Sequence, residues 1–547
     1  MSALTQALGP GLLVAALAAP LIVLAASLSV RLRGLAWATA PAAPLPALAA
    51  AVLAIAGAPF GAELPALRVS LWLDRPAAML LAAAALVWVI GGVFALTDRA
   101  GRPNADRFAV SWLLTMAGSI GVFIAADLLT FYLVYALVSV PAYYLVAHDD
   151  DDPGAIRAGA VYIAFALLGE AVLLLAFVML AAGEPGGSLS IRDVVGALPV
   201  SHWRDAALAL LIVGFGMKIA LAPTHGWMPL AYTAAPIPAA AVLSGAAVKA
   251  GVIGLIRFLP FGAALPGWGE ALVWAGFVSA FYGAAIGLTQ TNPKTVLAYS
   301  SISQMGVIAA ALGMGLASGD QASASDVAFY AANHVLVKAA LFLTVGVVAA
   351  RSGRARPLAL VVGAALALSL GGLPLTGGAL AKLAVKDAFG DGPAKWAAAA
   401  SAAASTALML HFVLRLARAP ENGRVPASRE RFLSWLALAA LSILVPWLLF
   451  PAIGGNLVDA VATGTLWDAL WPMLIGAAAA ALWALGEPLP RIPAGDIVVA
   501  EEAGFRALAP LGDLVERLDW TLRQWPAAGL SLLTIALALA AAGFASR

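Results

Sequence analysis

The chain has 547 residues, of which 63% are hydrophobic and 11% are charged, and its formal net charge is +2. Soluble domains are about half apolar and about a quarter charged, so this composition excludes a soluble globular protein. The small net charge argues against nucleic-acid binding. The absence of cysteine excludes disulfides, thiolate-bound metals and iron–sulfur clusters. We therefore expect no metal and no cofactor in this chain, although the cysteine count leaves haem bound by histidine open.

Apolar blocks long enough to cross a bilayer recur along the whole chain. A transmembrane helix needs about 20 mostly apolar residues. The blocks lie at 11–30, 36–57, 77–97, 109–126, 128–147, 160–182, 206–222, 236–259, 271–289, 296–316, 327–349, 358–387, 396–417, 432–452, 470–486 and 528–544. They are continuous rather than alternating, which disfavours a β-barrel. The sequence therefore predicts an all-α integral membrane protein with about 14 to 16 transmembrane helices.

The arginines outside these blocks are unevenly distributed between the loops. Most of them follow odd-numbered blocks, as Arg31, Arg99 and Arg351 do, and few follow even-numbered blocks. Loops rich in arginine and lysine stay on the cytoplasmic side of a membrane. We therefore expect a multi-pass protein of the inner (plasma) membrane, with its N-terminus outside.

The segment 487–525 differs from the rest of the chain because it is polar, and one more apolar block follows it. This pattern is typical of an amphipathic connector that lies on the membrane surface. The alternative is a docking element for a neighbouring subunit.

The lysines are the most informative residues of the sequence. Only seven lysines accompany twenty-four arginines, and five of the seven lie within apolar blocks. These five are Lys218, Lys249, Lys338, Lys382 and Lys386. An ammonium group in the hydrocarbon region costs at least about 2.5 kcal/mol. Unlike arginine, a buried lysine can lose its proton, so a row of such amines suits a proton relay. Snorkelling to the interface or static pairing is the alternative.

Other ionisable residues accompany these lysines. His334 and Lys338 are four residues apart and share one helix face, and Glu170 lies in the middle of its block, where it needs a cation or a proton. Three further residues are accessory candidates with equally good structural roles. Asp127 opens a block at an interface, His225 follows a proline as a relay or capping group, and Lys386 lies beside Asp387 near a block end.

Two of the blocks that carry lysines are interrupted. Lys218 is followed by Leu221-Ala-Pro-Thr-His225, and Lys382 is preceded by Gly371-Gly-Leu-Pro374 and Gly377-Gly378. Non-helical backbone at membrane depth survives only where protein or water satisfies it, and paired interrupted spans indicate inverted-repeat transporters. The interrupted blocks are the seventh and the twelfth, which predicts two inverted five-helix repeats. Ordinary kinked helices are the alternative.

This spacing divides the chain into four parts. Residues 1–108 hold the first three helices, 109–259 the first repeat (helices 4–8), 260–418 the second repeat (helices 9–13), and 419–547 the C-terminal helices with the polar connector.

The motifs around the lysines resemble a known family. The matching stretches keep their order and spacing between roughly residues 110 and 390. They are Gly214-Phe-Gly-Met-Lys218, His225-Gly-Trp-Met-Pro229, Leu243-Ser-Gly245 with Lys249, Lys294-Thr-Val-Leu-Ala-Tyr-Ser-Ser-Ile-Ser-Gln-Met-Gly306, Asn333-His334 with Lys338, and Gly372-Leu-Pro374 with Lys382. As a set they resemble the antiporter-like subunits of Mrp-type cation/proton antiporters, of respiratory complex I (NADH:quinone oxidoreductase) and of hydrogenase-4 complexes. The D-type Mrp subunit is the most similar of these.

The resemblance implies roles for five residues, which together with Glu170 form the six relay residues. Lys218 matches the lysine of the first broken helix, which pairs with a glutamate of the fifth helix in this family. Lys249 matches the connecting lysine of the eighth helix, and Lys382 the terminal lysine of the second broken helix. His334 and Lys338 match the central residues of the eleventh helix. Glu170 is the sixth relay residue because one position of the chain departs from the family pattern.

One position departs from the family pattern. The glutamate of the fifth-helix motif aligns with Ala136, so the usual partner of Lys218 is missing. Glu170 of the adjacent helix is the replacement that we favour, because an unpaired carboxylate in mid-span is costly. The alternative is an altered or inactive first half-channel. Leu230 also stands where related chains often carry an acid.

We therefore expect a proton-conducting subunit of a multisubunit cation/proton antiporter or related ion-pumping complex. A proton-pumping subunit of an NADH:quinone oxidoreductase-like or hydrogenase complex is the first alternative, and a scaffold that conducts no ions is the second. We expect no redox chemistry in the chain itself. Expected partners are the other membrane subunits, the bilayer, and protons, with Na⁺ or K⁺ as further candidate ions.

Overall fold

The computed structural model describes residues 2–99, 104–149, 151–350, 355–420, 428–485 and 490–499. The chain divides into a large unit, residues 1–494, and a small unit, residues 495–547. In the small unit residues 495–499 are described, and 496–499 are helical. The predicted connector 487–525 is described only at 490–499, and the predicted block 528–544 lies outside the described residues.

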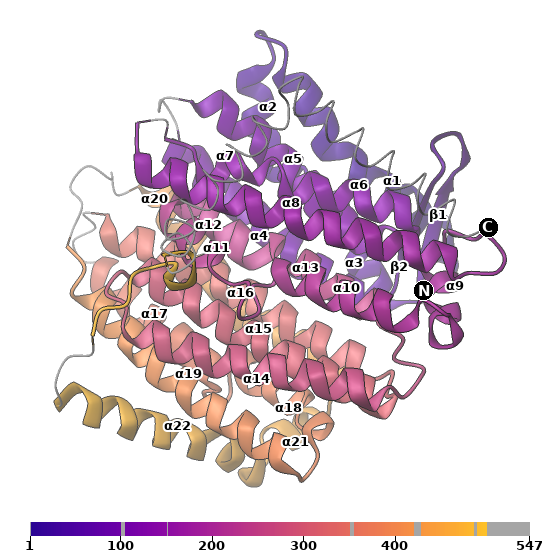
Figure 1. Cartoon of the computed structure of the whole chain (residues 1–547). Coiled ribbons are helices and arrows are strands. Elements are labelled where there is room, and N and C mark those ends of the chain that lie inside the picture. Colours follow the sequence, from indigo (N-terminus) through magenta and orange to yellow (C-terminus); the bar gives the residue numbers. More distant parts are fainter. Residues whose placement is uncertain are drawn as a thin grey trace, which may run out of the picture. The chain divides into compact units, whose positions relative to one another are not determined.

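The large unit consists almost entirely of helices (Figure 1). Up to residue 258 its elements are α1 (Ser2–Ser27), α2 (Arg33–Thr39), η1 (Ala40–Ala42), α3 (Leu45–Ala56), β1 (Phe60–Leu64), η2 (Pro65–Leu67), β2 (Val69–Leu73), α4 (Arg75–Arg99), α5 (Ala105–Ile124), α6 (Leu128–Ser139), α7 (Ala142–Val146), α8 (Pro153–Ala182), α9 (Ile191–Ala197), η3 (Leu198–Val200), α10 (Arg204–Lys218), α11 (Trp227–Ala234), α12 (Ile237–Val242), η4 (Leu243–Ala247) and α13 (Lys249–Phe258). The remaining elements are α14 (Pro266–Leu288), α15 (Pro293–Ser318), α16 (Ser323–Ala349), α17 (Ala355–Gly371), α18 (Gly377–Ala384), η5 (Asp387–Phe389), α19 (Pro393–Ala417), α20 (Arg429–Leu449), η6 (Phe450–Ile453), α21 (Leu457–Ala460) and α22 (Thr463–Leu485).

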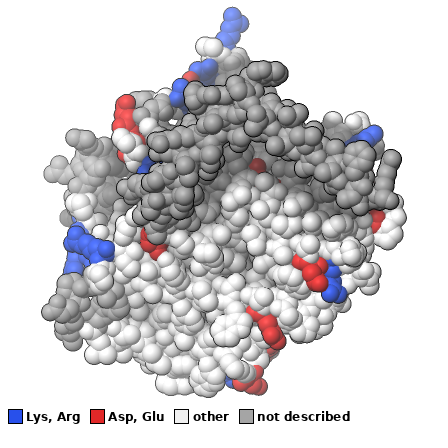
Figure 2. Space-filling model, in the orientation of Figure 1, with Lys and Arg blue, Asp and Glu red and all other residues white. Residues whose placement is uncertain are grey.

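Thirteen helical segments of the described residues are long and apolar enough to cross a membrane. They correspond to the predicted blocks except the seventh, the twelfth and the last. The view in Figure 2 agrees with a lipid-facing exterior, because a broad area without charged residues has lysine, arginine, aspartate and glutamate near its margins. The predicted all-α membrane fold is therefore confirmed.

The seventh block ends in a break that a second short helix follows, and the twelfth block is itself broken into two helices. α10 ends at Lys218 and α11 starts at Trp227, while α17 ends at Gly371 and α18 starts at Gly377. Each break contains a residue with positive φ that is not glycine, Ala220 (58°) in the first and Leu375 (63°) in the second. Such backbone costs about 1–2 kcal/mol per residue, so tertiary packing must hold the breaks open. That the two halves are inverted repeats stays a prediction, as do the four part boundaries.

A β-hairpin between α3 and α4 was not predicted from the sequence. Strands β1 and β2 pair antiparallel, with Ala62 opposite Leu71, and Arg68 adopts left-handed backbone in the turn. Leu71 in turn bridges to Ala125, directly after α5. The hairpin therefore packs against the junction of α5 and α6.

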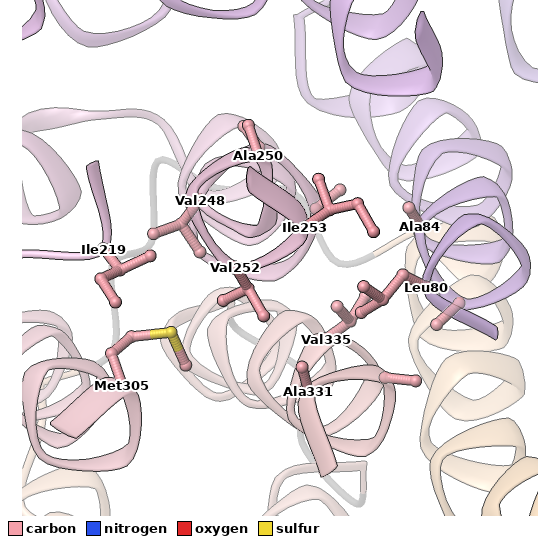
Figure 3. Packing of buried hydrophobic residues seen from close by; sticks show 14 of the residues in the cluster. Leu80, Ala84, Ile219, Val248, Ala250, Val252, Ile253, Met305, Ala331 and Val335 are labelled. Carbon is pink, nitrogen blue, oxygen red and sulfur yellow. The ribbon is translucent and has the colours of Figure 1, made fainter. Parts of the chain in front are cut away.

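Helix α13, which begins with Lys249, lies in the centre of the packed core. In Figure 3 Val248 extends toward Ile219, at the break after α10, and Ile253 extends toward Leu80 of α4. All four of these apolar side chains are fully buried or nearly so. The amine of Lys249 is thus surrounded by protein rather than lipid.

Helices α14 and α15 lie side by side (Figure 1), and glycines line their contact. Gly269, Gly276 and Gly283 recur every seven residues on α14, and Gly306 and Gly313 do so on α15. A Cβ atom at Gly276 would lie 2.5 Å from the carbonyl oxygen of Gly306. The two backbones are therefore too close for any side chain at this position.

We predict that Gly276→Ala lowers the midpoint of thermal unfolding, because overpacking a tight contact costs about 1–3 kcal/mol. Gly267→Ala in the same helix is the matched control, since a Cβ atom there meets nothing within 4 Å. Thermal unfolding followed by tryptophan fluorescence measures both. Equal midpoints for the two variants would contradict the close packing.

Candidate functional site

The first group of polar residues surrounds Lys218, the last residue of α10. Its Nζ donates a hydrogen bond to Ser139 Oγ at 2.7 Å. The rings of Tyr135 and Tyr162 lie 5.5 and 6.0 Å from the same nitrogen, within the range of cation–π attraction. Glu170 of α8 is 5% exposed and lies within electrostatic reach of Lys218 and of the Ser139 hydroxyl.

Lys218 and Glu170 are nevertheless not in direct contact. The ion pairs with nitrogen and oxygen within 4 Å in the described part of the chain do not include them. The oxygen that Lys218 contacts belongs to Ser139, one helical turn beyond Ala136 on α6. The carboxylate expected beside Lys218 is thus near the amine but separated from it.

The second group joins three fully buried bases. Lys249 Nζ and His334 Nδ1 are 3.0 Å apart, and Lys249 also approaches the Ser244 carbonyl oxygen at 3.4 Å. Lys338, four residues after His334 on α16, donates to the Leu297 carbonyl oxygen of α15 at 2.8 Å. All three side chains have zero solvent exposure, and the two lysines interact electrostatically with each other and with the histidine. The structure therefore brings Lys249, His334 and Lys338 together in one cluster.

The third group lies beside Lys382, on the second broken helix. Its Nζ donates to the carbonyl oxygen of Gly371, at the end of α17. Lys382 also lines a cleft of about 220 Å³, together with Gln304, Tyr330 and Ser405. Tyr330 donates to Gln304 Oε1 at 2.7 Å, and Gln304 Nε2 donates to Ser405 Oγ at 3.0 Å. Lys382 is therefore the relay residue with access to a sizeable cleft.

Glycines bring the three groups close to one another. A Cβ atom at Gly251 of α13 would lie 3.0 Å from Lys218 Cβ, so α13 packs directly on the break after α10. A Cβ atom at Gly377 would lie 2.3 Å from Asn333 Oδ1, so the start of α18 abuts the residue before His334. Each broken helix thus touches an element of the central cluster.

The opposite end of α13 is anchored by a partly buried cation. Arg257 donates to the carbonyl oxygens of Phe123 at 2.5 Å and Trp72 at 3.1 Å, and also to that of Ala125. These carbonyls lie at the C-terminal ends of α5 and β2. At the end of helix α5 a positive charge complements the helix dipole. At its Lys249 end α13 is preceded by η4, a π-helical segment, and such segments are frequent at functional sites.

The accessory candidates have contacts of a structural kind. Asp127 caps α6 by accepting from the Thr130 backbone at 2.8 Å, and it also accepts from the Ser70 backbone at 3.0 Å. The ring of His225 packs against that of Tyr282, with centroids 4.7 Å apart. Lys386 pairs with Asp468 at 2.7 Å, and both are about half exposed at the cleft.

The sequence did not identify Ser139, Gln304 or Tyr330 as site residues. Ser139 is a single polar residue in an apolar stretch, a pattern that more often reflects a local backbone contact than a site. Gln304 lies within the family motif that ends at Gly306, and Tyr330 precedes Asn333 and His334 on one helix. The spacing of Ser139 from Ala136 is the one signal that could have identified it. Within the described ranges, no group of three or more histidine, aspartate or glutamate side chains is placed to bind a metal ion.

A protein-family model described as "NADH:quinone oxidoreductase/Mrp antiporter, TM" matches residues 125–406, just over half of the chain. The chain belongs to this family. All six relay residues lie within the matched range. The family expected from the motifs is therefore confirmed.

Curated relatives in this family come from different kinds of complex. NADH-quinone oxidoreductase subunit M of Pseudomonas aeruginosa is 32% identical over 250 residues, 44% of this chain and 48% of that protein. Hydrogenase-4 component B of Escherichia coli strain K12 is 27% identical over 296 residues, 52% of this chain and 44% of that protein. The chain thus spans about half the length of the curated relatives it matches.

A solved structure supports the fold over nearly the whole chain. The structure of the Mrp complex from Dietzia sp. DQ12-45-1b aligns with a TM-score of 0.74 and 22% identity. The alignment covers 98% of this chain and 63% of that one. This antiporter-like chain is therefore a multi-pass membrane protein of the shared fold.

We predict that Lys386→Ala changes transport little and unfolding free energy by less than about 1 kcal/mol, the range of exposed ion pairs. The reason is that Lys386 and Asp468 are both about half exposed. Denaturation midpoints and proton movement in membrane vesicles measure the two effects. A loss of proton movement comparable to that of a buried-lysine variant would instead place Lys386 in the relay.

Proposed function

We propose that this chain is the proton-conducting subunit of a multisubunit cation/proton antiporter or related ion-pumping complex. The observation that carries the proposal is the 3.0 Å contact between Lys249 Nζ and His334 Nδ1 in a site without solvent exposure. A hydrogen bond between two basic nitrogens requires that at least one of them be neutral. An excess proton at this contact has two adjacent groups that can each hold it.

The proposed route runs through the three groups in order. It starts at Glu170 and Lys218, continues through Lys249 to His334 and Lys338, and ends at Lys382 beside the cleft. The contacts of Gly251 with Lys218 and of Gly377 with Asn333 support this order, because they bring the broken helices onto the cluster. Side-chain motion and water bridge the remaining gaps.

Electrostatic switching gives the movement its direction. A nearby carboxylate favours the ammonium form of Lys218, and moving Glu170 away favours the neutral amine. Lys218 then passes its proton toward Lys249. Only lysine allows this step, because the guanidinium of arginine does not release its proton in proteins.

The driving reaction is the second part of the proposal. A strong Na⁺ site needs several oxygen ligands, and carboxylates are few in the apolar blocks of this chain. We therefore assign protons to this chain and the cation to a neighbouring subunit. A role in an NADH:quinone oxidoreductase-like or hydrogenase complex is the alternative that the names of the relatives support.

The setting of the chain is also proposed. We infer that the arginine-rich loops after odd-numbered blocks lie in the cytoplasm. The N-terminus is then outside, and the membrane is the inner (plasma) membrane. Other membrane subunits of the complex are the expected partners.

We predict that Lys249→Ala and Lys382→Ala abolish proton movement, by at least about 100-fold for a lost proton-transfer group. Lys249→Arg fails equally, because it keeps the charge but cannot release the proton. Lys395→Ala is the control, since Lys395 forms an exposed ion pair with Asp391 at 2.8 Å. A pH-sensitive dye in membrane vesicles records the response to pulses of Na⁺, K⁺ or an electron donor.

Assembly of each variant into its complex is checked by native electrophoresis. Normal proton movement in assembled Lys249→Ala and Lys382→Ala would overturn the relay. A response of the wild type to Na⁺ or K⁺ alone identifies an antiporter, whereas a response to the electron donor alone identifies a redox-driven pump.

A scaffold that conducts no ions is the second candidate function. The separation of Lys218 from Glu170, and the alanine at position 136, are the observations that favour it. A scaffold needs no movable proton at Lys218.

We predict that Glu170→Gln reduces proton movement about ten-fold or more, because it removes the carboxylate that favours the ammonium form of Lys218. The dye assay and the assembly check above measure it. An unchanged rate with normal assembly would favour the scaffold.

A further inference from the structure

Lys294 is the seventh lysine of the chain, and neither the relay nor an exposed ion pair accounts for it. Four of the other lysines are relay residues, and Lys386 and Lys395 form exposed ion pairs. Lys294 lies in the first turn of α15, and its Nζ donates to the carbonyl oxygens of Thr233 at 2.6 Å and Ala235 at 2.5 Å. Hydrogen bonds from a charged donor are roughly twice as strong as neutral ones, so Lys294 holds these two carbonyls firmly.

The two carbonyls lie at the C-terminal end of α11, the second half of the first broken helix. The last carbonyls of a helix have no partner within it, and Pro236, which follows, has no N–H to donate. A cation at this end also complements the helix dipole. Thr295, the next residue of α15, adds a second contact, because its Oγ1 lies 2.8 Å from Thr233 Oγ1. The start of α15 therefore caps the end of α11 and fixes it.

The opposite end of α11 reaches the surroundings of Lys218. Trp227, the first residue of α11, donates its indole N–H to the carbonyl oxygen of Met217 at 2.9 Å, and Met217 directly precedes Lys218. The Trp227 ring also packs edge-on against that of Tyr162, with centroids 5.4 Å apart. The Tyr162 ring is one of the two that lie within cation–π range of the Lys218 amine. A displacement of α11 would therefore reach Lys218 through both its backbone and its aromatic neighbour.

A largely buried carboxylate lies near Lys294. Asp98, near the end of α4, lies within electrostatic reach of Lys294. Asp98 also pairs with Arg431 of α20 at 3.3 Å, and both of these side chains are largely buried. An opposite charge nearby favours the charged form of an ionisable group. These surroundings suit a permanent cation, a requirement that arginine would also meet.

We propose that Lys294 is a positioning residue, a permanent cation that holds α11 in place and thereby fixes the surroundings of Lys218. Lys294 transfers no proton itself. It differs in this from Lys249, which must release a proton, whereas Lys294 must keep its charge. This inference deepens the proposed function and rests on it for the effect on transport.

The test uses two substitutions of Lys294 and a matched control. Lys294→Met keeps the length of the side chain and removes its charge, while Lys294→Arg keeps the charge. Arg356→Met is the control, because Arg356 likewise donates to two carbonyl oxygens at the end of a helix, those of Ala417 and Ala419. The helix that Arg356 caps, α19, is unbroken. All variants are studied in the complete complex in its membrane, and assembly is checked as above.

Hydrogen–deuterium exchange of backbone amides reports on α11 independently of transport, and the dye assay reports on proton movement. We expect Lys294→Met to speed exchange within residues 227–235 and to slow proton movement about ten-fold, the effect of losing a hydrogen bond from a charged group. Lys294→Arg should recover both, whereas Lys249→Arg does not conduct. Arg356→Met should leave both measurements unchanged.

A double variant tests whether Lys294 acts through α11. Trp227→Phe removes the indole N–H that bonds to Met217. Residues that act through one element have effects that do not add. We therefore expect Lys294→Met combined with Trp227→Phe to slow proton movement no more than the slower single variant does. A slowing equal to the product of the two single effects would overturn the connection through α11.

Failure of this inference and failure of the relay are distinguishable. Wild-type exchange in assembled Lys294→Met overturns the hold on α11, and wild-type transport overturns its importance for Lys218, whatever Lys249→Ala does. Loss of transport in Lys294→Arg with normal exchange would make Lys294 a proton-transferring group and overturn its fixed charge. Faster exchange in Lys294→Met, together with normal transport in Lys249→Ala, would support the hold on α11 but overturn the relay.

Discussion

The cost of placing an ammonium group in an apolar interior governs this structure. The hydrocarbon core of the bilayer offers no oxygen or nitrogen to a buried amine, so the protein must provide one. The relay lysines contact three kinds of partner: a hydroxyl for Lys218, an imidazole for Lys249, and backbone carbonyls for Lys338 and Lys382. In the described contacts none of these partners is a carboxylate, so none holds the lysine in its charged form as firmly as an ion pair would.

The broken helices follow from the same constraint. An intact helix uses its carbonyl oxygens internally, whereas one that ends leaves its last carbonyls available. The end of α17 provides the Gly371 carbonyl to Lys382, and α10 ends at Lys218 itself. The strained residues Ala220 and Leu375 in these breaks cost free energy. We infer that this strain is tolerated because the breaks position polar atoms at the relay.

The sequence allowed much of this arrangement to be predicted, because the signals were strong and local. Long apolar blocks, prolines and glycines indicated the helices and the two interruptions, and the spacing of His334 and Lys338 placed them on one face. The β-hairpin escaped because its strands are short and lie between two apolar blocks. Ser139 escaped for another reason: its importance arises from a contact 79 residues away in the chain. The sequence showed that the family glutamate is missing at Ala136, but it did not show that Lys218 contacts Ser139 instead.

The two ends of α13 differ in a way that constrains how Lys249 can move. At one end Arg257 donates hydrogen bonds to three backbone carbonyls, and at the other end an irregular π-helical turn precedes Lys249. Helix α13 is held by hydrogen bonds at its Arg257 end and follows the irregular segment at its Lys249 end, so it can turn only about the Arg257 end. Displacements of Lys249 should therefore originate in residues 243–247, and the core beneath Arg257 should stay still throughout a transport cycle.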